Sequence, residues 1–224
     1  MTTRTAKTVP SLYLIAGIFV FATMTLTLWQ ISQSIRDGEP LTIADARFSS
    51  WLRTHHTPGM TRAMFAITAL GSTLVVSSIA AAFGIYFISR RCFYWLTAFM
   101  SSVFGGMLLN RLLKYAFHRP RPFFDNPLLT LTGYSFPSGH TMLATVLCGV
   151  LAAYFFSNTK DWRQRIVVIL SATLVIALVG FSRIYLGAHY LSDVLGAFAE
   201  GLAWLSVCLT LGDFARRRQS KSDT

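Results

Sequence analysis

The chain has 224 residues, of which 53% are hydrophobic and only 13% are charged, and its formal net charge is +11. A soluble domain carries about 25% charged residues, and the hydrophobic residues here come in long runs, so the composition excludes an ordinary soluble protein. The positive charge does not indicate a nucleic-acid partner, because a bundle of membrane spans offers no element that reads a groove. The pattern predicts an all-α, polytopic membrane protein embedded in the lipid bilayer.

Six hydrophobic runs are long enough to cross the bilayer as helices, which needs about 20 apolar residues each. The predicted spans cover residues 10–31, 64–88, 92–117, 140–156, 166–181 and 191–211. No internal repeat or second domain is visible, so residues 1–224 are expected to form one membrane-embedded domain. The first run follows a basic start, as a cleaved signal peptide would, but it is long and lacks a small-residue cleavage site, which favours a span.

Basic residues gather in the segments that six spans would place on one side of the membrane. They are Arg4 and Lys7 near the N-terminus, Arg90 and Arg91 after the second span, Lys160, Arg163 and Arg165 after the fourth, and Arg216, Arg217, Arg218 and Lys221 after the sixth. Positively charged loops stay in the cytoplasm. We therefore expect a bacterial inner membrane protein with both termini in the cytoplasm and the remaining loops facing the periplasm or exterior.

A short amphipathic segment lies between the first two spans. Apolar side chains recur at helical spacing over residues 41–52, whereas Asp45 and Arg47 fall elsewhere on the helical wheel. The pattern predicts an interfacial helix that lies on the outer surface of the membrane, with an ordered loop as the alternative. Such a helix would serve as a lid or guide over a lipid entrance.

No motif in the sequence indicates a metal ion or a cofactor. The sequence has no zinc-protease, aspartate-rich or nucleotide-binding motif, and its three cysteines fall in or beside different spans. We therefore predict no metal ion and no cofactor. Glu200 is a lone acid inside a span. Lining of a lipid cavity is one alternative, but we expect a structural partner such as an arginine or a backbone group.

Three polar clusters stand at the outer ends of the predicted spans, where charged residues are costly and therefore functional candidates. The first contains Lys114 and Arg121, which offer phosphate a compact charge and a planar fork of donors. The second is Pro137-Ser138-Gly139-His140, at the start of a predicted helix. Ser138 is a plausible N-cap and Gly139 lets a ligand approach the backbone, while the helix N-terminus favours an anion.

The third cluster joins Arg183 to His189 and Asp193. Residues four apart on a helix share a face, so Asp193 can hold one ring nitrogen of His189 as N–H and leave the other free to attack. Each cluster alone also has a structural explanation. Basic residues at a helix end can snorkel, a histidine can follow a helix start by chance, and a His–Asp pair can be a simple hydrogen bond.

Together, the clusters resemble the tripartite signature of the type 2 phosphatidic acid phosphatase (PAP2) superfamily. Lys114 is followed after six residues by Arg121-Pro122, the PSGH segment comes next, and Ser182-Arg183, five residues, His189, three residues and Asp193 complete the pattern. No motif position is substituted. The chain is similar to the small bacterial phosphatidylglycerophosphate and undecaprenyl diphosphate phosphatases of that superfamily.

The resemblance implies a lipid phosphatase that forms a phosphohistidine and uses no cofactor. His189 would be the nucleophile, Asp193 would orient it, and His140 would protonate the departing oxygen. The phosphoryl oxygens would be held by Lys114, Arg121, Ser138, Gly139 and Arg183. Undecaprenyl diphosphate, phosphatidylglycerophosphate and phosphatidate all remain candidate substrates. Two alternatives stay open: a lipid phosphotransferase that uses the same intermediate, and a non-catalytic lipid-binding or transport protein.

Overall fold

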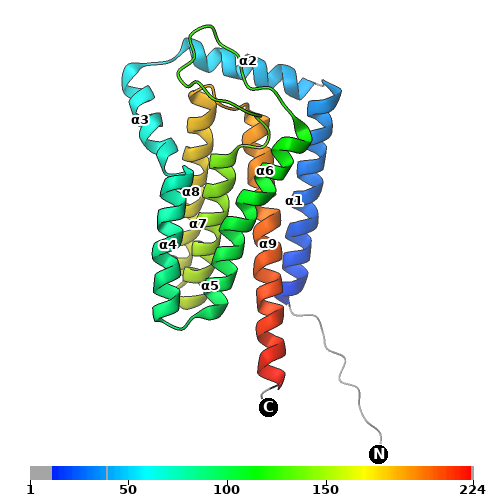
Figure 1. Cartoon of the computed structure of the whole chain (residues 1–224), viewed down its shortest axis with the longest axis vertical. Coiled ribbons are helices and arrows are strands. Elements are labelled where there is room, and N and C mark those ends of the chain that lie inside the picture. Colours follow the sequence, from blue (N-terminus) through cyan, green and yellow to red (C-terminus); the bar gives the residue numbers. More distant parts are fainter. Residues whose placement is uncertain (1–11, 39, 223–224) are drawn as a thin grey trace, which may run out of the picture.

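The structure is a computed structural model that describes residues 12–38 and 40–222. Every regular element in that part of the chain is helical, as the hydrophobic runs predict (Figure 1). The helices are α1 (Leu12–Asp37), α2 (Pro40–Thr54), α3 (Pro58–Ala69), α4 (Thr73–Ser89), α5 (Phe93–Met100), α6 (Gly106–Phe117), α7 (Gly139–Asn158), α8 (Trp162–Tyr185) and α9 (Leu191–Ser222), and a π-helical turn, Ser101–Gly105, joins α5 to α6. Arg4 and Lys7 lie outside the described residues, as do the side chains of Arg217, Arg218 and Lys221.

Within the described residues, five helical units are long and apolar enough to cross a membrane: α1, α5 with α6, α7, α8 and α9. The second predicted span, residues 64–88, is not one continuous helix. The chain breaks between α3 and α4 and bends there by 40°, so these two helices together make the sixth candidate span. Ser72 starts α4 anew, because its side chain accepts a hydrogen bond from the Val75 backbone N–H at 3.3 Å.

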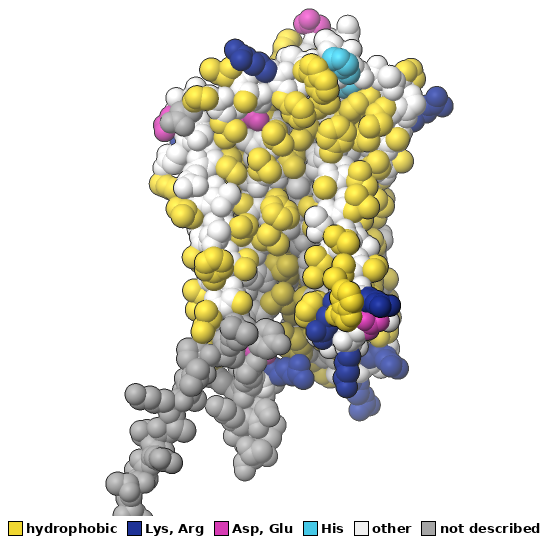
Figure 2. All heavy atoms as spheres, turned by 180° about the vertical axis from the view of Figure 1, so that it is seen from behind, with side chains coloured by type: hydrophobic (Ala, Val, Ile, Leu, Met, Phe, Trp, Pro, Cys, Tyr) yellow, Lys and Arg dark blue, Asp and Glu magenta, His cyan; other side chains and the backbone are white. Residues whose placement is uncertain are grey.

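Helix α7 lies at the centre of the bundle. It packs against α8 and α9, and also against α4 and α6, while α1 runs along α9. The buried apolar side chains at the core include Val76, Phe87, Phe99, Met142, Val146 and Val150. Large hydrophobic side chains also cover the outside of the helices, as expected for a surface that faces lipid (Figure 2).

The two ends of the bundle carry different features (Figure 1). One end holds α2, the irregular segment 118–138 and the turn between α8 and α9. The opposite end holds the turns after α4 and α7, with their basic residues, and the end of α9. Helix α2 covers the predicted segment 41–52 and lies across its end of the bundle, so the loop alternative is wrong.

Candidate active site

His189 and Asp193 face each other where α9 begins. His189 Nδ1 lies 3.4 Å from Asp193 Oδ2, and both side chains are buried. The backbone N–H of His189 donates to the Arg183 carbonyl at 3.3 Å, which ties the turn to the end of α8. Burial lowers the pKa of His189 to about 4, although the Asp193 carboxylate acts in the opposite direction. The ring is therefore neutral near pH 7, and with Nδ1 protonated it keeps a lone pair on Nε2.

Arg121 lies on the other side of the His189 ring. Its Nη1 is 3.4 Å from His189 Nε2 and donates to the Ala188 carbonyl at 2.9 Å. Its Nε donates to the Gly133 carbonyl at 3.2 Å. The backbone therefore holds a fixed cation beside the ring nitrogen that faces away from Asp193.

Lys114 and Arg183 bring two further cations to this end of the bundle. Lys114 Nζ donates to the carbonyls of Tyr134 at 3.0 Å and Ser135 at 3.3 Å, which leaves one of its three N–H donors. Arg183 is buried and donates from Nη1 to Thr68 Oγ1 at 2.9 Å. Its Nε has no partner among the described residues. Both cations therefore retain donor capacity, which phosphoryl oxygens could use.

The start of α7 differs in one detail from the expected N-cap. Ser138 occupies the cap position, but its hydroxyl makes no hydrogen bond to the helix backbone and instead accepts one from Thr141 Oγ1 at 3.0 Å. The first N–H groups of α7 consequently have no side-chain cap in the described structure, so the helix end keeps its capacity to bind an anion.

Gly139 and His140 place this helix end beside the cations. A Cβ on Gly139 would lie 3.3 Å from Asn110 Oδ1 and 4.0 Å from Lys114 Cε, so the backbone there is close to α6. The Ser138 backbone N–H donates to the Asp193 carbonyl at 3.1 Å, which ties the start of α7 to the start of α9. The three clusters, separate in the sequence, therefore meet at the α2 end of the bundle.

Two charged residues to which the sequence assigns no role are also buried here. Arg119 donates from Nη1 to Asp193 Oδ1 at 2.6 Å and from Nη2 to Asp45 Oδ2 at 2.9 Å. Asp45 was expected only to lie off the apolar stripe of its helix, yet it is 1% exposed. The sequence did hold one indication that Asp45 is unusual, because it is the sole acidic residue between residues 40 and 124.

Glu200 has the structural partner that was expected, but of a different kind. Asn110 Nδ2, on α6, donates to Glu200 Oε2 at 2.8 Å, and both side chains are buried. Among the described residues, no three His, Cys, Asp or Glu side chains gather in a group that could hold a metal ion.

Comparison with known proteins agrees with this arrangement. The model of the PAP2 superfamily matches residues 93–217, which include all three clusters. The chain belongs to the PAP2 superfamily. The phosphatidylglycerophosphatase B of Bacillus subtilis is 36% identical over 149 residues, which cover 65% of this chain and 71% of that protein. The undecaprenyl-diphosphatase BcrC of the same organism is 35% identical over 105 residues, 44% of this chain and 48% of the relative.

Among solved structures, a transmembrane PAP2-type phosphatidylglycerolphosphate phosphatase from Bacillus subtilis superposes with a TM-score of 0.77 at 28% identity. The match covers 89% of this chain and 97% of that one. The PAP2 fold and its lipid phosphatase relatives establish this chain as a multi-pass membrane phosphatase that acts on lipid phosphates.

Proposed function

We propose that this PAP2 phosphatase transfers a phosphoryl group from its lipid substrate to His189 Nε2 and then to water. One observation carries the proposal: the two ring nitrogens of His189 face opposite partners, Nδ1 towards Asp193 and Nε2 towards Arg121, each at 3.4 Å. A neutral imidazole in that setting has its nucleophilic nitrogen next to a cation that can hold a phosphoryl oxygen. The whole chain would act as one membrane-embedded catalytic unit.

In the first step the Nε2 lone pair would attack phosphorus and the bond to the leaving oxygen would break. His140 would donate a proton to that oxygen, which leaves as a lipid alcohol or as a lipid phosphate. In the second step water would attack the phosphohistidine, with His140 taking its proton, and the N–P bond would break. Inorganic phosphate would leave and His189 would return to its neutral form.

The phosphoryl oxygens would be held by groups fixed to the chain. They are the side chains of Lys114, Arg121, Arg183 and Ser138 and the backbone N–H of Gly139. Preorganised donors of this kind stabilise the charge that spreads over the oxygens in the transition state. The three cations supply the charge that a metal ion provides in other phosphoryl-transfer enzymes, so we expect activity without added metal.

Phosphatidylglycerophosphate is our first candidate substrate. Both the Bacillus subtilis phosphatidylglycerophosphatase B, which matches 65% of this chain, and the solved structure with a TM-score of 0.77 are named for that reaction. Undecaprenyl diphosphate is the second candidate, because another relative is named as a diphosphatase of that lipid. Transfer to an acceptor lipid instead of water would need the same residues.

We further propose that the site opens to the periplasm or exterior of a bacterial inner membrane, with both termini in the cytoplasm. Support comes from the basic turns, which lie at the opposite end of the bundle from the site.

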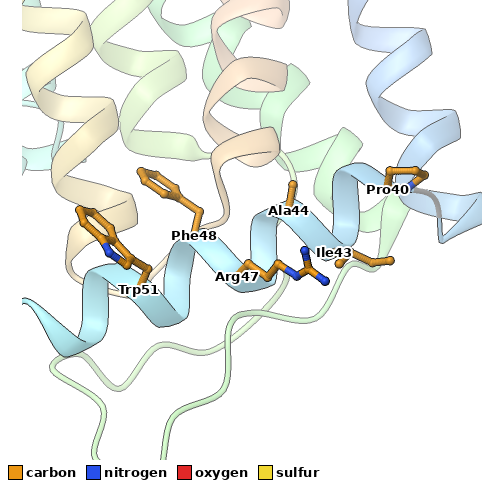
Figure 3. A pocket seen from close by; sticks show the side chains of 6 residues that line it. All are labelled: Pro40, Ile43, Ala44, Arg47, Phe48 and Trp51. Carbon is orange, nitrogen blue, oxygen red and sulfur yellow. The ribbon is translucent and has the colours of Figure 1, made fainter.

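Helix α2 would then lie in the interface on the outer side of that membrane. Side chains of α2 line a hollow of about 590 Å³, and two of them, Ile43 and Trp51, are more than half exposed (Figure 3).

The test is phosphate release by the purified full chain in detergent with chelator present. The substrates are phosphatidylglycerophosphate, undecaprenyl diphosphate and phosphatidate, and an acceptor lipid is added in a parallel reaction to detect transfer. We expect hydrolysis by the wild type and none by His189→Ala, while His55→Ala, at an exposed histidine just after α2, keeps full activity. Turnover by a folded His189→Ala protein would overturn the assignment of the nucleophile.

A further inference from the structure

Arg119 is a buried arginine that none of the three clusters includes. Only 6% of it is exposed, and its guanidinium lies over the Tyr190 ring at 4.5 Å. Nη1 donates to Asp193 Oδ1 and to Ser192 Oγ at 2.7 Å, and Nη2 donates to Asp45. One cation thus bridges two buried carboxylates from helices that are far apart in the sequence.

Asp45 completes the bridge from α2. Its Oδ1 accepts the backbone N–H of Ser192 at 3.0 Å, and its Oδ2 accepts the Ser192 hydroxyl as well as Arg119. Ser192 lies in the first turn of α9, where the N–H groups lack partners within the helix and the helix dipole favours a negative charge. Asp45 therefore caps α9 from another helix and fixes the turn that carries Asp193.

Asp193 is held at both oxygens. Oδ1 accepts from Arg119, while Oδ2 accepts the Tyr190 backbone N–H at 2.9 Å and the Ser135 hydroxyl, and it is also the oxygen that faces His189 Nδ1. These contacts leave the carboxylate little freedom to rotate. The orientation of the His189 ring therefore depends on a carboxylate that Arg119 and Asp45 hold in place.

We propose that Arg119 is a positioning residue for the His189–Asp193 pair and that Asp45 couples α2 to that pair through it. The inference rests on the proposed role of His189. Arg119 itself would touch neither the phosphoryl group nor the lipid. Its function would be to keep Asp193 Oδ2 on Nδ1, so that Nε2 points at phosphorus.

A purely structural ion pair would also tie α2 to the bundle, so the experiment must separate the two roles. Lysine keeps the charge of Arg119 but has no planar fork to bridge two carboxylates. We expect Arg119→Lys to lower kcat by about 100-fold, the scale of a misplaced reacting group, with KM changed less than about twofold. In an Asp193→Asn background, assayed with an activated aryl phosphate, the same change should have less than about a twofold effect, because residues that act through one another are not additive. Independent effects that multiply would contradict the proposal.

Loss of one buried charge can unfold the protein, so a charge-balanced variant is needed as well. Asp45→Asn with Arg119→Gln removes one negative and one positive charge, so the net charge of the buried network is unchanged. We expect this double variant to fold and to lose kcat as strongly as Arg119→Lys. Arg111→Lys, at an exposed arginine of α6, serves as the matched control. Wild-type kcat in the folded double variant would overturn the proposal.

A readout independent of turnover distinguishes this inference from the proposed function. The ¹⁵N spectrum of the histidine rings, assigned with His189→Gln, should show His189 as the single Nδ1–H tautomer in the wild type and as a mixture in the double variant. An unchanged tautomer would reject the positioning role even if the wild type hydrolyses lipids. Suppose that the wild type shows the single Nδ1–H tautomer and the double variant the mixture, but that the wild type hydrolyses none of the three lipids. That result would contradict the proposed function alone.

Discussion

The backbone of Gly71 lies against His140 so closely that a Cβ on Gly71 would sit 2.8 Å from the His140 carbonyl oxygen. The same atom would lie 2.7 Å from Val179 Cγ1 on α8. The break between α3 and α4 is therefore packed directly on the start of α7, which carries the proposed general acid.

Gly71→Ala should consequently disturb both stability and activity. We expect a loss of about 1–3 kcal/mol of unfolding free energy, typical of overpacking, because backbone and a short side chain must both move. Activity should fall as well, since the shift displaces His140. Gly59→Ala, where the added Cβ would meet nothing within 4 Å, is the control. Thermal unfolding and initial rates measure the two effects, and equal behaviour of the two variants would contradict the packing argument.

His140→Ala should affect substrates according to their leaving groups. An alkoxide-like oxygen needs a proton as the bond breaks, so we expect a loss of about 100-fold or more with a lipid phosphate monoester. An activated aryl phosphate leaves as a weak base and needs little protonation, so the loss there should be below about tenfold. Parallel measurements of kcat/KM with both substrates check this. Equal losses would count against His140 as the general acid.

The protonation of His189 should occur at unusually low pH. An exposed histidine titrates near 6.5, whereas burial places the pKa of His189 at about 4. Because the folded value is depressed, the neutral, nucleophilic ring persists above about pH 4 and is lost as the pH falls through that value. The ¹⁵N shifts of His189, followed from pH 7 to 4, measure the midpoint directly. A midpoint near 6.5 would show that the ring is solvated.

The sequence predicts a large part of this fold because its strongest signals are local. Hydrophobic runs of span length identify the helices, and the all-helical, membrane-spanning fold they predict is confirmed. The helix ends are less well determined: residues 166–181 lie inside α8, and α9 extends beyond residue 211. Hydrophobicity marks the apolar part of a helix but not its polar ends.

The role of Asp45, which the sequence missed, depends on a partner far along the chain. Asp45 resembles a solvated acid on an amphipathic helix until Arg119, 74 residues later, is brought against it. The break near Gly71 has a local cause, because Ser72 caps α4 through the Val75 backbone N–H, and the backbone there also packs against α7 and α8. The motif positions could be aligned from their spacing, but the network that supports Asp193 could only be seen in three dimensions.

Glu200 and Asn110 should act as a structural pair. Glu200→Leu would leave the buried Asn110 amide without its acceptor, and we expect a loss of about 1–3 kcal/mol of unfolding free energy. Glu200→Gln keeps an oxygen for Asn110 and should cost less than about 1 kcal/mol. Thermal or denaturant unfolding in detergent compares the two variants. If leucine is tolerated as well as glutamine, the hydrogen bond at 2.8 Å contributes nothing measurable.

The sidedness of the site follows from charge distribution and can be tested with paired cysteines. After replacement of Cys92, Cys148 and Cys208, one cysteine is placed at the exposed Thr130, in the segment beside the site, or at the exposed Ser157, near the opposite end of α7.

Because the basic turns favour the cytoplasm, Thr130→Cys should react with a membrane-impermeant thiol reagent in intact cells. Ser157→Cys should react only after lysis, which makes each variant the control for the other. The reverse pattern would place the site in the cytoplasm.

The activity of each variant should persist in chelator, since the proposed chemistry relies on protein cations alone. Vanadate should inhibit it, because vanadate mimics the five-coordinate phosphoryl group. Loss of activity in chelator would reject the metal-free mechanism whichever way the site faces.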